Sequence, residues 1–554
     1  MSLPEVRQQR TFFDTDQVLG RLVATAPQGA ERFVFFAQRI WPELLKLRPG
    51  LQKMYCLENG RPAEEPVRMT GVTILQFMER LPDRQAAEAC TWDGRWKLAL
   101  HMEVDEPGFH PTTLVKFRER LVRHGLERIG FEGVLNAMRE AGYLPRKARQ
   151  RLDSSHMLGL VSHMSRLECM RETLRLALEA LERIEALARP EGWPVWWERY
   201  VENKLDYQAG AAQLRAKMEQ AGRDVRDLLR WAQEQEAARS VAETLGRLER
   251  VYAENFEETE GGQVDQRRAQ PPGAVHNPHD PEAQWSTKNT IKDKSWVGYK
   301  VQVSETVEEN VRAAKEPTRA VITAVVTQAA TASDKAALPV VEEAWAATAQ
   351  EKPTELYVDA GYTSGAEVVR AQAEGRELKG PMAPAPTKEG RLSSEMFDVC
   401  VADRQAVCPA GQTSTNCSRL EVQKTGDVMY RFEWNKALCA NCPQCSQCLG
   451  EGQSHRTLLV GEHHDAIQGR RQEQKTAVFQ ADMRHRNAIE GTISELTRSH
   501  GMRHCRYRGL AKARLQNWFI GAACNLKRWC RRQAWELQQA KGAIGAETPA
   551  AIAA

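Results

Sequence analysis

Residues 354–365, TELYVDAGYTSG, hold a short apolar segment that stops at an acidic residue. Residues 355–358 are β-prone, which predicts a short buried strand. Asp359 follows that strand, and residues 363–365, Thr-Ser-Gly, are a signal for the start of a helix. An Asp close to a glycine is ordinary turn chemistry, whereas strand ends in α/β sheets are also where catalytic groups lie. Partners elsewhere in the chain decide between these two interpretations.

The length and composition indicate a large globular protein. At 554 residues the chain exceeds what one compact core normally holds, so we expect several domains or one domain with large insertions. It is 42% hydrophobic and 27% charged, which excludes a wholly disordered chain. The N-terminus shows no signal-peptide pattern, and no apolar run approaches the roughly 20 residues that a membrane helix requires. We therefore expect a cytoplasmic protein with no membrane partner.

Positive charge is concentrated near the C-terminus, although the formal net charge is only +4. Between Arg484 and Arg532 there are twelve lysine or arginine residues and two acidic residues, and aromatic side chains lie between them. A basic segment with interleaved aromatic residues suits a polyanion such as DNA. A second basic stretch, residues 110–121, predicts a helix whose charges fit either a solvated face or a DNA contact.

Three acidic residues stand out by their positions in the predicted elements. Asp153 lies on or just after a short strand, Asp359 ends a later strand, and Glu490 lies in a predicted helix. Carboxylate oxygens are the ligands that Mg²⁺ prefers. Two metal ions about 4 Å apart can activate an attacking oxygen and stabilise a leaving one. Carboxylates from adjacent strands and a packed helix can serve both ions, which indicates phosphoryl-transfer chemistry.

Each of these acidic residues has a structural alternative. Asp153 precedes two serines and could cap a helix, and Asp280 in HDPEAQW is its rival as the first acid. Asp334 in TASDKAAL fits a helix N-cap better than a site residue. Glu490 and Arg486 could form a plain i,i+4 helix pair. His156, near the first acid, could line the site, but a lone histidine is more often structural.

The motifs together resemble those of bacterial insertion-sequence transposases with a DDE catalytic core. The residues that carry the resemblance are 60–66 and 110–121 in the N-terminal helices, LDSSHMLG at 152–159, HDPEAQW at 279–285, SWVGYKVQVSET at 295–306, YVDAGYTSG at 357–365 and the helix from 486 to 516. Each motif alone is loose, but their order is specific. The resemblance covers most of the chain apart from residues 165–260 and the C-terminal tail.

The resemblance implies an α/β fold with a ribonuclease-H-like catalytic core, in which a mixed sheet is flanked by helices. It implies that Asp153, Asp359 and Glu490 are catalytic and hold two Mg²⁺ ions, with Mn²⁺ as a substitute. Arg486 keeps the family's position four residues before the glutamate. Where many relatives have a tyrosine and a lysine, this chain has Met483 and Thr497. Arg498, beside Thr497, is the candidate to replace that lysine.

The domain organisation follows from the resemblance and from the composition along the chain. We predict a helical N-terminal DNA-binding domain at 1–145, the first-acid strand of the core at 146–165, a helical insertion and linker at 166–274, core strands with the second acid at 275–385, a small Cys-rich insertion at 386–465, the glutamate helix and basic helices at 466–540, and a flexible tail at 541–554.

Seven of the 13 cysteines fall between Cys400 and Cys448. In a reducing compartment such a cluster favours a metal over disulfides, and C-x₂-C pairs present two thiolates together to zinc. The resemblance favours Cys408, Cys439, Cys442 and Cys448 as the zinc ligands and leaves Cys445 as an extra cysteine. An iron–sulfur cluster and unliganded reduced thiols are the alternatives.

The function implied by the resemblance is DNA transposition. The protein would bind the terminal inverted repeats of its element as a homodimer, cut the DNA with water, and join 3′-hydroxyls to target DNA, with no small-molecule substrate. It would be associated with the bacterial nucleoid when bound. The residues expected to contact phosphates are Arg486, Arg498, Arg503, Arg506, Arg508 and Lys512. The alternatives are a repurposed, inactive DNA-binding protein and a nuclease that does not join strands.

Overall fold

The structure is a computed structural model. It describes residues 1–3, 15–25, 30–56, 60–185, 187–204, 210–259, 263–289, 294–308, 315–385, 390–423 and 426–546. Within this part of the chain, no helix is both long enough and apolar enough to cross a membrane. Residues 547–554 of the expected tail lie outside the described residues.

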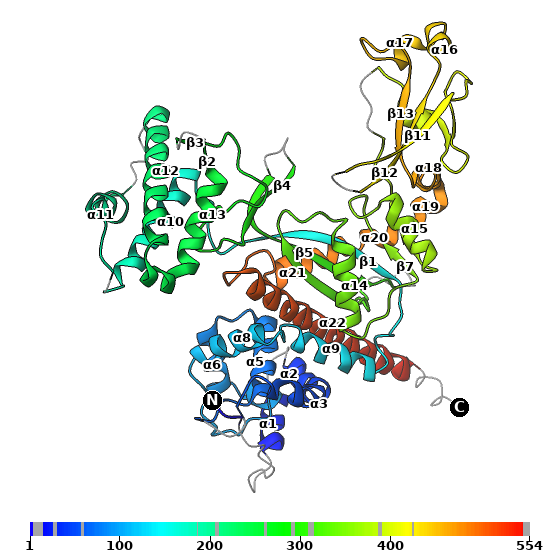
Figure 1. The fold of residues 1–554 in the computed structure, drawn as a ribbon. Helices are drawn as coiled ribbons and strands as arrows, with labels where there is room; N and C mark the ends of the chain where they lie inside the picture. Colours follow the sequence, from blue (N-terminus) through cyan, green and yellow to red (C-terminus); the bar gives the residue numbers. More distant parts are fainter. Residues whose placement is uncertain are drawn as a thin grey trace, which may run out of the picture.

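A six-stranded mixed sheet lies at the centre of the molecule (Figure 1). Strand β1 (Gln150–Leu158) pairs antiparallel with β5 (Lys294–Thr306) on one side and parallel with β7 (Glu355–Tyr357) on the other. β7 pairs in parallel with β8 (Glu377–Lys379). Two further strands pair antiparallel with successive parts of β5: β4 (Gln284–Asn289) with its beginning and β6 (Ile322–Ala329) with the remainder. This order confirms the predicted ribonuclease-H-like fold.

The sheet forms where period-two apolar patterns are strongest. Tyr299, Val301 and Val303 alternate along β5, and all three are fully buried. Helix α14 (Ala337–Ala347) packs on β5 and β6, and α15 (Gly365–Ala373) packs beside β8. The helices after the Cys-rich insertion are α18 (His464–Glu473), α19 (Ala477–Asp482), α20 (Arg484–Asn487), α21 (Ile489–Ser499) and α22 (Leu510–Ala546). Of these, α20 and α21 pack against β1, and α22 packs against β6.

Helix α22 lies between the sheet and the N-terminal helices (Figure 1). On one side it packs on β6, and on the other on α5 (Pro66–Glu79) and α9 (Ile129–Glu140). The contact is close, since a Cβ atom at Gly521 would lie 2.8 Å from Val325 and 3.0 Å from Phe131. One continuous hydrophobic cluster therefore includes side chains of the N-terminal helices, α22 and the sheet.

The N-terminal region is helical, as its periodicity indicates. The elements before β1 other than α5 and α9 are α1 (Thr15–Ala24), α2 (Glu31–Phe35), the π-helical turn Phe36–Ile40, α3 (Trp41–Lys46), α4 (Arg48–Gln52), α6 (Asp83–Trp92), α7 (Gly94–Ala99) and α8 (Thr112–Arg123). In the basic helix α8, Arg118 is buried, pairs with Asp83 and stacks on Tyr507. Arg118 is therefore structural, while Lys116 on the same helix is exposed.

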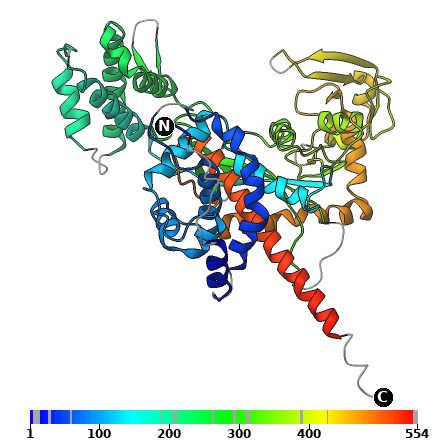
Figure 2. The ribbon, with the colours of Figure 1, turned by 90° about the horizontal axis from the view of Figure 1, so that it is seen from below.

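The helical insertion has a hydrophobic core of its own. Its elements are α10 (Arg166–Glu182), α11 (Trp193–Trp197), the π-helical turn Glu198–Glu202, α12 (Ala211–Gln233), the 3₁₀ turn Glu236–Val241, α13 (Ala242–Asn255), β2 (Phe256–Glu258) and β3 (Val264–Gln266). A capping box between Ser165 and Glu168 starts α10. Figure 2 shows this insertion and the Cys-rich insertion on opposite sides of the molecule.

The Cys-rich insertion is a small β structure with a separate core around Phe397, Phe432 and Trp434. Its elements are the 3₁₀ turn Ser394–Met396, β9 (Asp398–Cys400), β10 (Gln405–Val407), β11 (Asn416–Glu421), β12 (Val428–Glu433), α16 (Lys436–Ala440), α17 (Cys445–Cys448) and β13 (Thr457–Gly461). Its expected N-terminal boundary falls at residues 386–389, which are outside the described part of the chain.

A fully buried ion network joins the sheet to α22. Glu305 on β5 accepts hydrogen bonds from Arg151 at 2.7 Å, Arg528 at 2.9 Å and Thr492 at 2.7 Å. Burial alone would raise the pKa of Glu305, but Arg151 and Arg528 outweigh it and hold that pKa below the usual 4.5. The carboxylate therefore remains charged in the folded protein at neutral pH.

We expect Glu305→Gln to destabilise the protein by about 3–5 kcal/mol, because it leaves two buried guanidinium groups without their shared charge. Since the folded pKa is lowered, the stabilisation by Glu305 is present above the unfolded pKa and is lost as pH falls through the folded value. Urea denaturation of both proteins at neutral and acidic pH measures this. If the difference in unfolding free energy between the two proteins did not shrink towards low pH, the charged state assigned to Glu305 would be contradicted.

Candidate active site

Asp153 lies within β1 and is 9% exposed. Its Oδ1 accepts a hydrogen bond from the backbone N–H of Ser154 at 2.7 Å, and its Oδ2 accepts one from Arg486 at 2.8 Å. The strand continues to Leu158, so Asp153 does not cap a helix. β1 is central in the sheet, and this carboxylate therefore has a fixed place beside α20.

Asp359 lies two residues beyond the end of β7, and its side chain is 39% exposed. Its Oδ1 accepts a hydrogen bond from the backbone N–H of Gly361 at 2.8 Å, so the turn chemistry expected from the sequence is present. Its Oδ2 lies 3.8 Å from Arg486. The buried hydroxyl of Tyr362 donates to Gln302 on β5 and anchors the same loop to the sheet. Asp359 is thus both a turn residue and a member of the cluster of acids.

Glu490 is the second residue of α21, and its side chain is 70% exposed. Its Oε1 lies 3.7 Å from Nη1 of Arg486, four residues earlier. The same guanidinium therefore lies within 4 Å of all three acids. An acid within β1, an acid just beyond β7 and a helix acid therefore converge on Arg486. This convergence goes beyond a plain i,i+4 helix pair.

The rival acid Asp280 has a different environment. It is buried, it accepts hydrogen bonds from the hydroxyl of Tyr299 at 2.9 Å and from the backbone N–H of Gly509 at 3.2 Å, and burial raises its pKa. These contacts join β5 to the start of α22. The contacts of Asp280 thus hold the fold together, and Asp280 is not one of the acids that pair with Arg486.

Asp334 is not a helix N-cap, because the residue at the N-cap of α14 is Ala336. Its carboxylate lies 3.4 Å from Lys300 on β5. A Cβ atom at Gly361 would lie 3.1 Å from Asp334 and 3.0 Å from Asp359, so the two acids flank the same glycine. The N-cap prediction for Asp334 was therefore wrong, and its carboxylate lies at the margin of the cluster of acids.

The basic residues expected at phosphates fall into two groups. Arg503 donates to the carbonyl of His156 at 3.0 Å, and Arg506 donates to the carbonyl of Leu81 at 2.9 Å and covers the ring of Phe77. These two side chains hold the chain in place. Arg498 and Arg508 are exposed, and Lys512 lies 3.7 Å from Glu119.

Five of the seven cysteines of the Cys-rich insertion line a small cavity: Cys408, Cys439, Cys442, Cys445 and Cys448. Burial raises the pKa of the Cys448 thiol; Arg456 opposes this, and Cys439, Cys408 and Cys442 add to it. Backbone N–H groups of Gln412 and Arg456 donate to sulfur atoms at 3.4 and 3.5 Å, respectively. Thiols around one cavity, with N–H donors beside them, suit thiolates, so the chemistry of this donor set fits a zinc ion.

A second group of potential ligands is less suited to a metal. Ligand atoms of Glu495, His500 and Cys524 lie within 4.8 Å of one another. Both oxygens of Glu495, however, already accept hydrogen bonds from Arg528 and Arg531. His500 is 1% exposed, and burial lowers its pKa to about 3. The adjacent guanidinium groups oppose a cation here, and we regard the trio as part of the α21–α22 packing.

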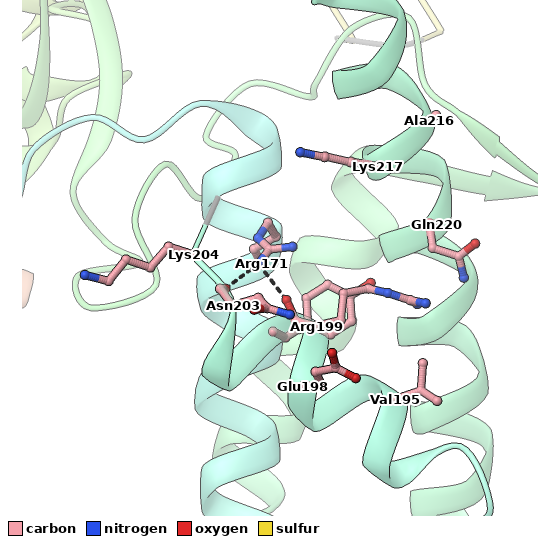
Figure 3. Close-up of a pocket in the computed structure, with 10 residues that line it drawn as sticks. Arg171, Val195, Glu198, Arg199, Asn203, Lys204, Ala216, Lys217 and Gln220 are labelled. Carbon is pink, nitrogen blue, oxygen red and sulfur yellow. Dashed lines mark hydrogen bonds between the residues drawn. The ribbon is translucent and has the colours of Figure 1, made fainter. Parts of the chain in front are cut away.

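A cavity of about 530 Å³ lies far from the acids, in the helical insertion (Figure 3). Arg171 and Arg199 line it, but Arg171 donates to backbone carbonyls of Arg199 and Asn203, and Arg199 pairs with Asp224. Figure 3 shows Lys217 on the wall formed by α12. The cationic groups of Arg171 and Arg199 serve the fold of the insertion, and the cavity adds nothing to the cluster of acids.

Comparisons with protein families give two matches. Residues 30–120 match a family described as transposase domain (DUF772), and residues 407–530 match one described as transposase DDE domain. The second match includes Arg486, Glu490 and all five cysteines that line the small cavity. A search of curated proteins gives no match.

These matches define a transposase, and its class of chemistry is that of a nuclease or transposition enzyme. The two matches, in the N-terminal and C-terminal parts of the chain, support an insertion-sequence DDE transposase. DNA is therefore its partner, and the DDE domain implies the use of divalent metal ions.

Proposed function

We propose that the protein cuts the ends of its own insertion sequence and joins them to target DNA. The convergence of Asp153, Asp359 and Glu490 on Arg486 supports this most directly. All three acids of the expected set are intact, which favours an active enzyme over a repurposed DNA-binding protein. A strand-transfer assay with DNA from the borders of the element distinguishes transposase, simple nuclease and inactive binder.

Asp153 and Asp359 would hold Mg²⁺ ions together with Glu490, and Mn²⁺ would substitute. These oxygen ligands fit a hard cation, and when bound the ions would activate water and stabilise the leaving 3′-oxygen. The chain's own contribution is to hold the carboxylates in place. β1 fixes Asp153, and the hydrogen bond from Gly361 fixes Asp359.

The proposed DNA ligand is the pair of terminal inverted repeats, brought together by a homodimer. The N-terminal helices and the exposed arginines near α21 would contact the DNA, because phosphate contacts supply most of the affinity. The Cys-rich insertion would hold one structural zinc ion through Cys408, Cys439, Cys442 and Cys448. These four cysteines and Cys445 line one cavity, which supports a metal site there, and the choice among the five follows the family resemblance.

We expect the double variant Arg498→Gln, Arg508→Gln to weaken binding to all duplexes alike, since phosphate contacts carry no base information. The slope of log affinity against log salt should fall by about 0.9 for each phosphate that is no longer neutralised. Fluorescence anisotropy over a salt series measures this. Arg506→Gln is the matched comparison: it removes the interactions with Leu81 and Phe77, so it should lower the thermal midpoint. A reduced midpoint with an unchanged slope in the double variant would contradict the assignment.

A further inference from the structure

In the described part of the chain, the guanidinium of Arg486 has a hydrogen-bond donor without a partner in its present position. Its one short contact to an acid among the described residues is the 2.8 Å hydrogen bond to Asp153, and its distances to Asp359 and Glu490 are 3.8 and 3.7 Å. Its Nε is buried and has no hydrogen-bond partner among the described residues. A buried polar atom without a partner costs free energy, so this guanidinium has capacity for a further ligand.

The charges around Arg486 are unbalanced in a second way. Three carboxylates lie within 4 Å of the Arg486 guanidinium, so at this point of the described structure negative charges outnumber the positive one. Like charges at close range repel, and an opposite charge among them stabilises their ionised forms. Divalent ions would occupy the same space and supply the same compensation. Arg486 and the ions therefore compete for the carboxylate oxygens.

If Arg486 bound a DNA phosphate, both its unpaired Nε donor and its competition with the ions for the carboxylates would be relieved. A guanidinium binds a phosphate through two parallel N–H donors, and the side chain of Arg486 belongs to the short helix α20 at the edge of the site. If Arg486 turned from the carboxylates to a phosphate, it would pair its free donor and expose the acid oxygens to the ions.

On this basis we propose that Arg486 is an exchangeable counter-ion, which holds the acids together until DNA arrives and is then transferred to the DNA backbone. This inference rests on the proposed function and deepens it. It makes DNA binding and metal binding mutually reinforcing, so that the metal site fills mainly on the nucleoprotein complex. Arg486 is a positioning residue in this scheme.

The test measures Mn²⁺ binding to the full-length protein by calorimetry, with and without a duplex from the border of the element. For the unmodified protein we expect DNA to tighten Mn²⁺ binding about tenfold or more, within the range usual for coupled sites. Arg486→Gln should bind Mn²⁺ about tenfold more tightly without DNA, and DNA should then have little further effect. By reciprocity, Mn²⁺ should strengthen DNA binding by the same factor in the unmodified protein.

Arg484→Gln is the matched control, because Arg484 lies on the same helix and is exposed. It should behave as the unmodified protein does. Arg486→Lys keeps the charge and serves if the Gln variant unfolds; its Mn²⁺ affinity without DNA should stay low. Unchanged or weaker Mn²⁺ binding in folded Arg486→Gln would overturn the inference alone. Mn²⁺ binding that does not respond to Asp153→Asn, with or without DNA, would overturn the proposed function as well.

Discussion

Asp153→Asn, Asp359→Asn and Glu490→Gln should each abolish cleavage at the ends of the element while binding to the same DNA persists. Each change replaces a charged oxygen ligand by a neutral amide and leaves the size of the side chain almost the same. A metal contributes several kcal/mol to the stabilisation of the transition state, and each 1.36 kcal/mol is tenfold in rate. We therefore expect rate reductions on the order of a thousandfold or more, measured by gel assay of end cleavage.

Asp280→Asn is the control for these three variants. Asp280 accepts from Tyr299 and Gly509, so its substitution should lower the thermal midpoint and leave the rate of cleavage by the folded protein intact. An active Asp153→Asn together with an inactive but folded Asp280→Asn would show that the first acid is Asp280. An equal loss of DNA binding in all three acid variants would instead indicate a defect in folding.

Removing the proposed zinc ion from the Cys-rich insertion should unfold that segment. Structural zinc contributes roughly 10–16 kcal/mol of binding free energy in small zinc modules, and the core around Phe432 and Trp434 is small. We expect purified protein to hold about one zinc per chain, and Cys442→Ser to abolish zinc binding. Elemental analysis measures the metal, and limited proteolysis with mass spectrometry measures whether the insertion is still folded.

Cys445→Ser is the matched comparison, since Cys445 lines the same cavity as Cys442. It should retain zinc and resist protease as the unmodified protein does. Loss of zinc in Cys445→Ser and retention in Cys448→Ser would require a different ligand set. Iron in the purified protein would favour a cluster instead, and the absence of any metal with all thiols titratable would refute the proposal.

Individual strands were predictable because their patterns are local. The short strand before Asp359 and the alternating residues of β5 have the periods of buried strands, whereas the ribonuclease-H-like fold was expected only from the resemblance that the ordered motifs carry. The place of Asp334 was not predictable, because a helix N-cap and a carboxylate beside Gly361 have the same local sequence. Three-dimensional proximity decides between them. The core that α22 shares with the N-terminal helices likewise depends on residues far apart in the chain, and no local pattern indicates it.

The roles of individual arginines were harder to predict than the positions of the acids. The acids stand out because strand ends and a helix signal place them. Arg506 and Arg118 look like surface cations in sequence, yet each is held by distant parts of the chain, at Leu81 and at Asp83. Only the tertiary fold separates a structural arginine from one that is available to a phosphate. The same limit applies to Arg486, whose present partners are carboxylates.

The position of α22 between two layers has a consequence for how this protein could be divided or shortened. Because its apolar side chains belong to one core that reaches from Phe36 to the sheet, the N-terminal helices cannot be exchanged as an independent cassette. A product that began after residue 145 would expose the face of α22 that now packs on α5 and α9, and such a surface favours aggregation. Specificity for a new element end would therefore have to arise by substitutions at exposed positions of the N-terminal helices. Replacing these helices by a foreign recognition module would destabilise the catalytic sheet.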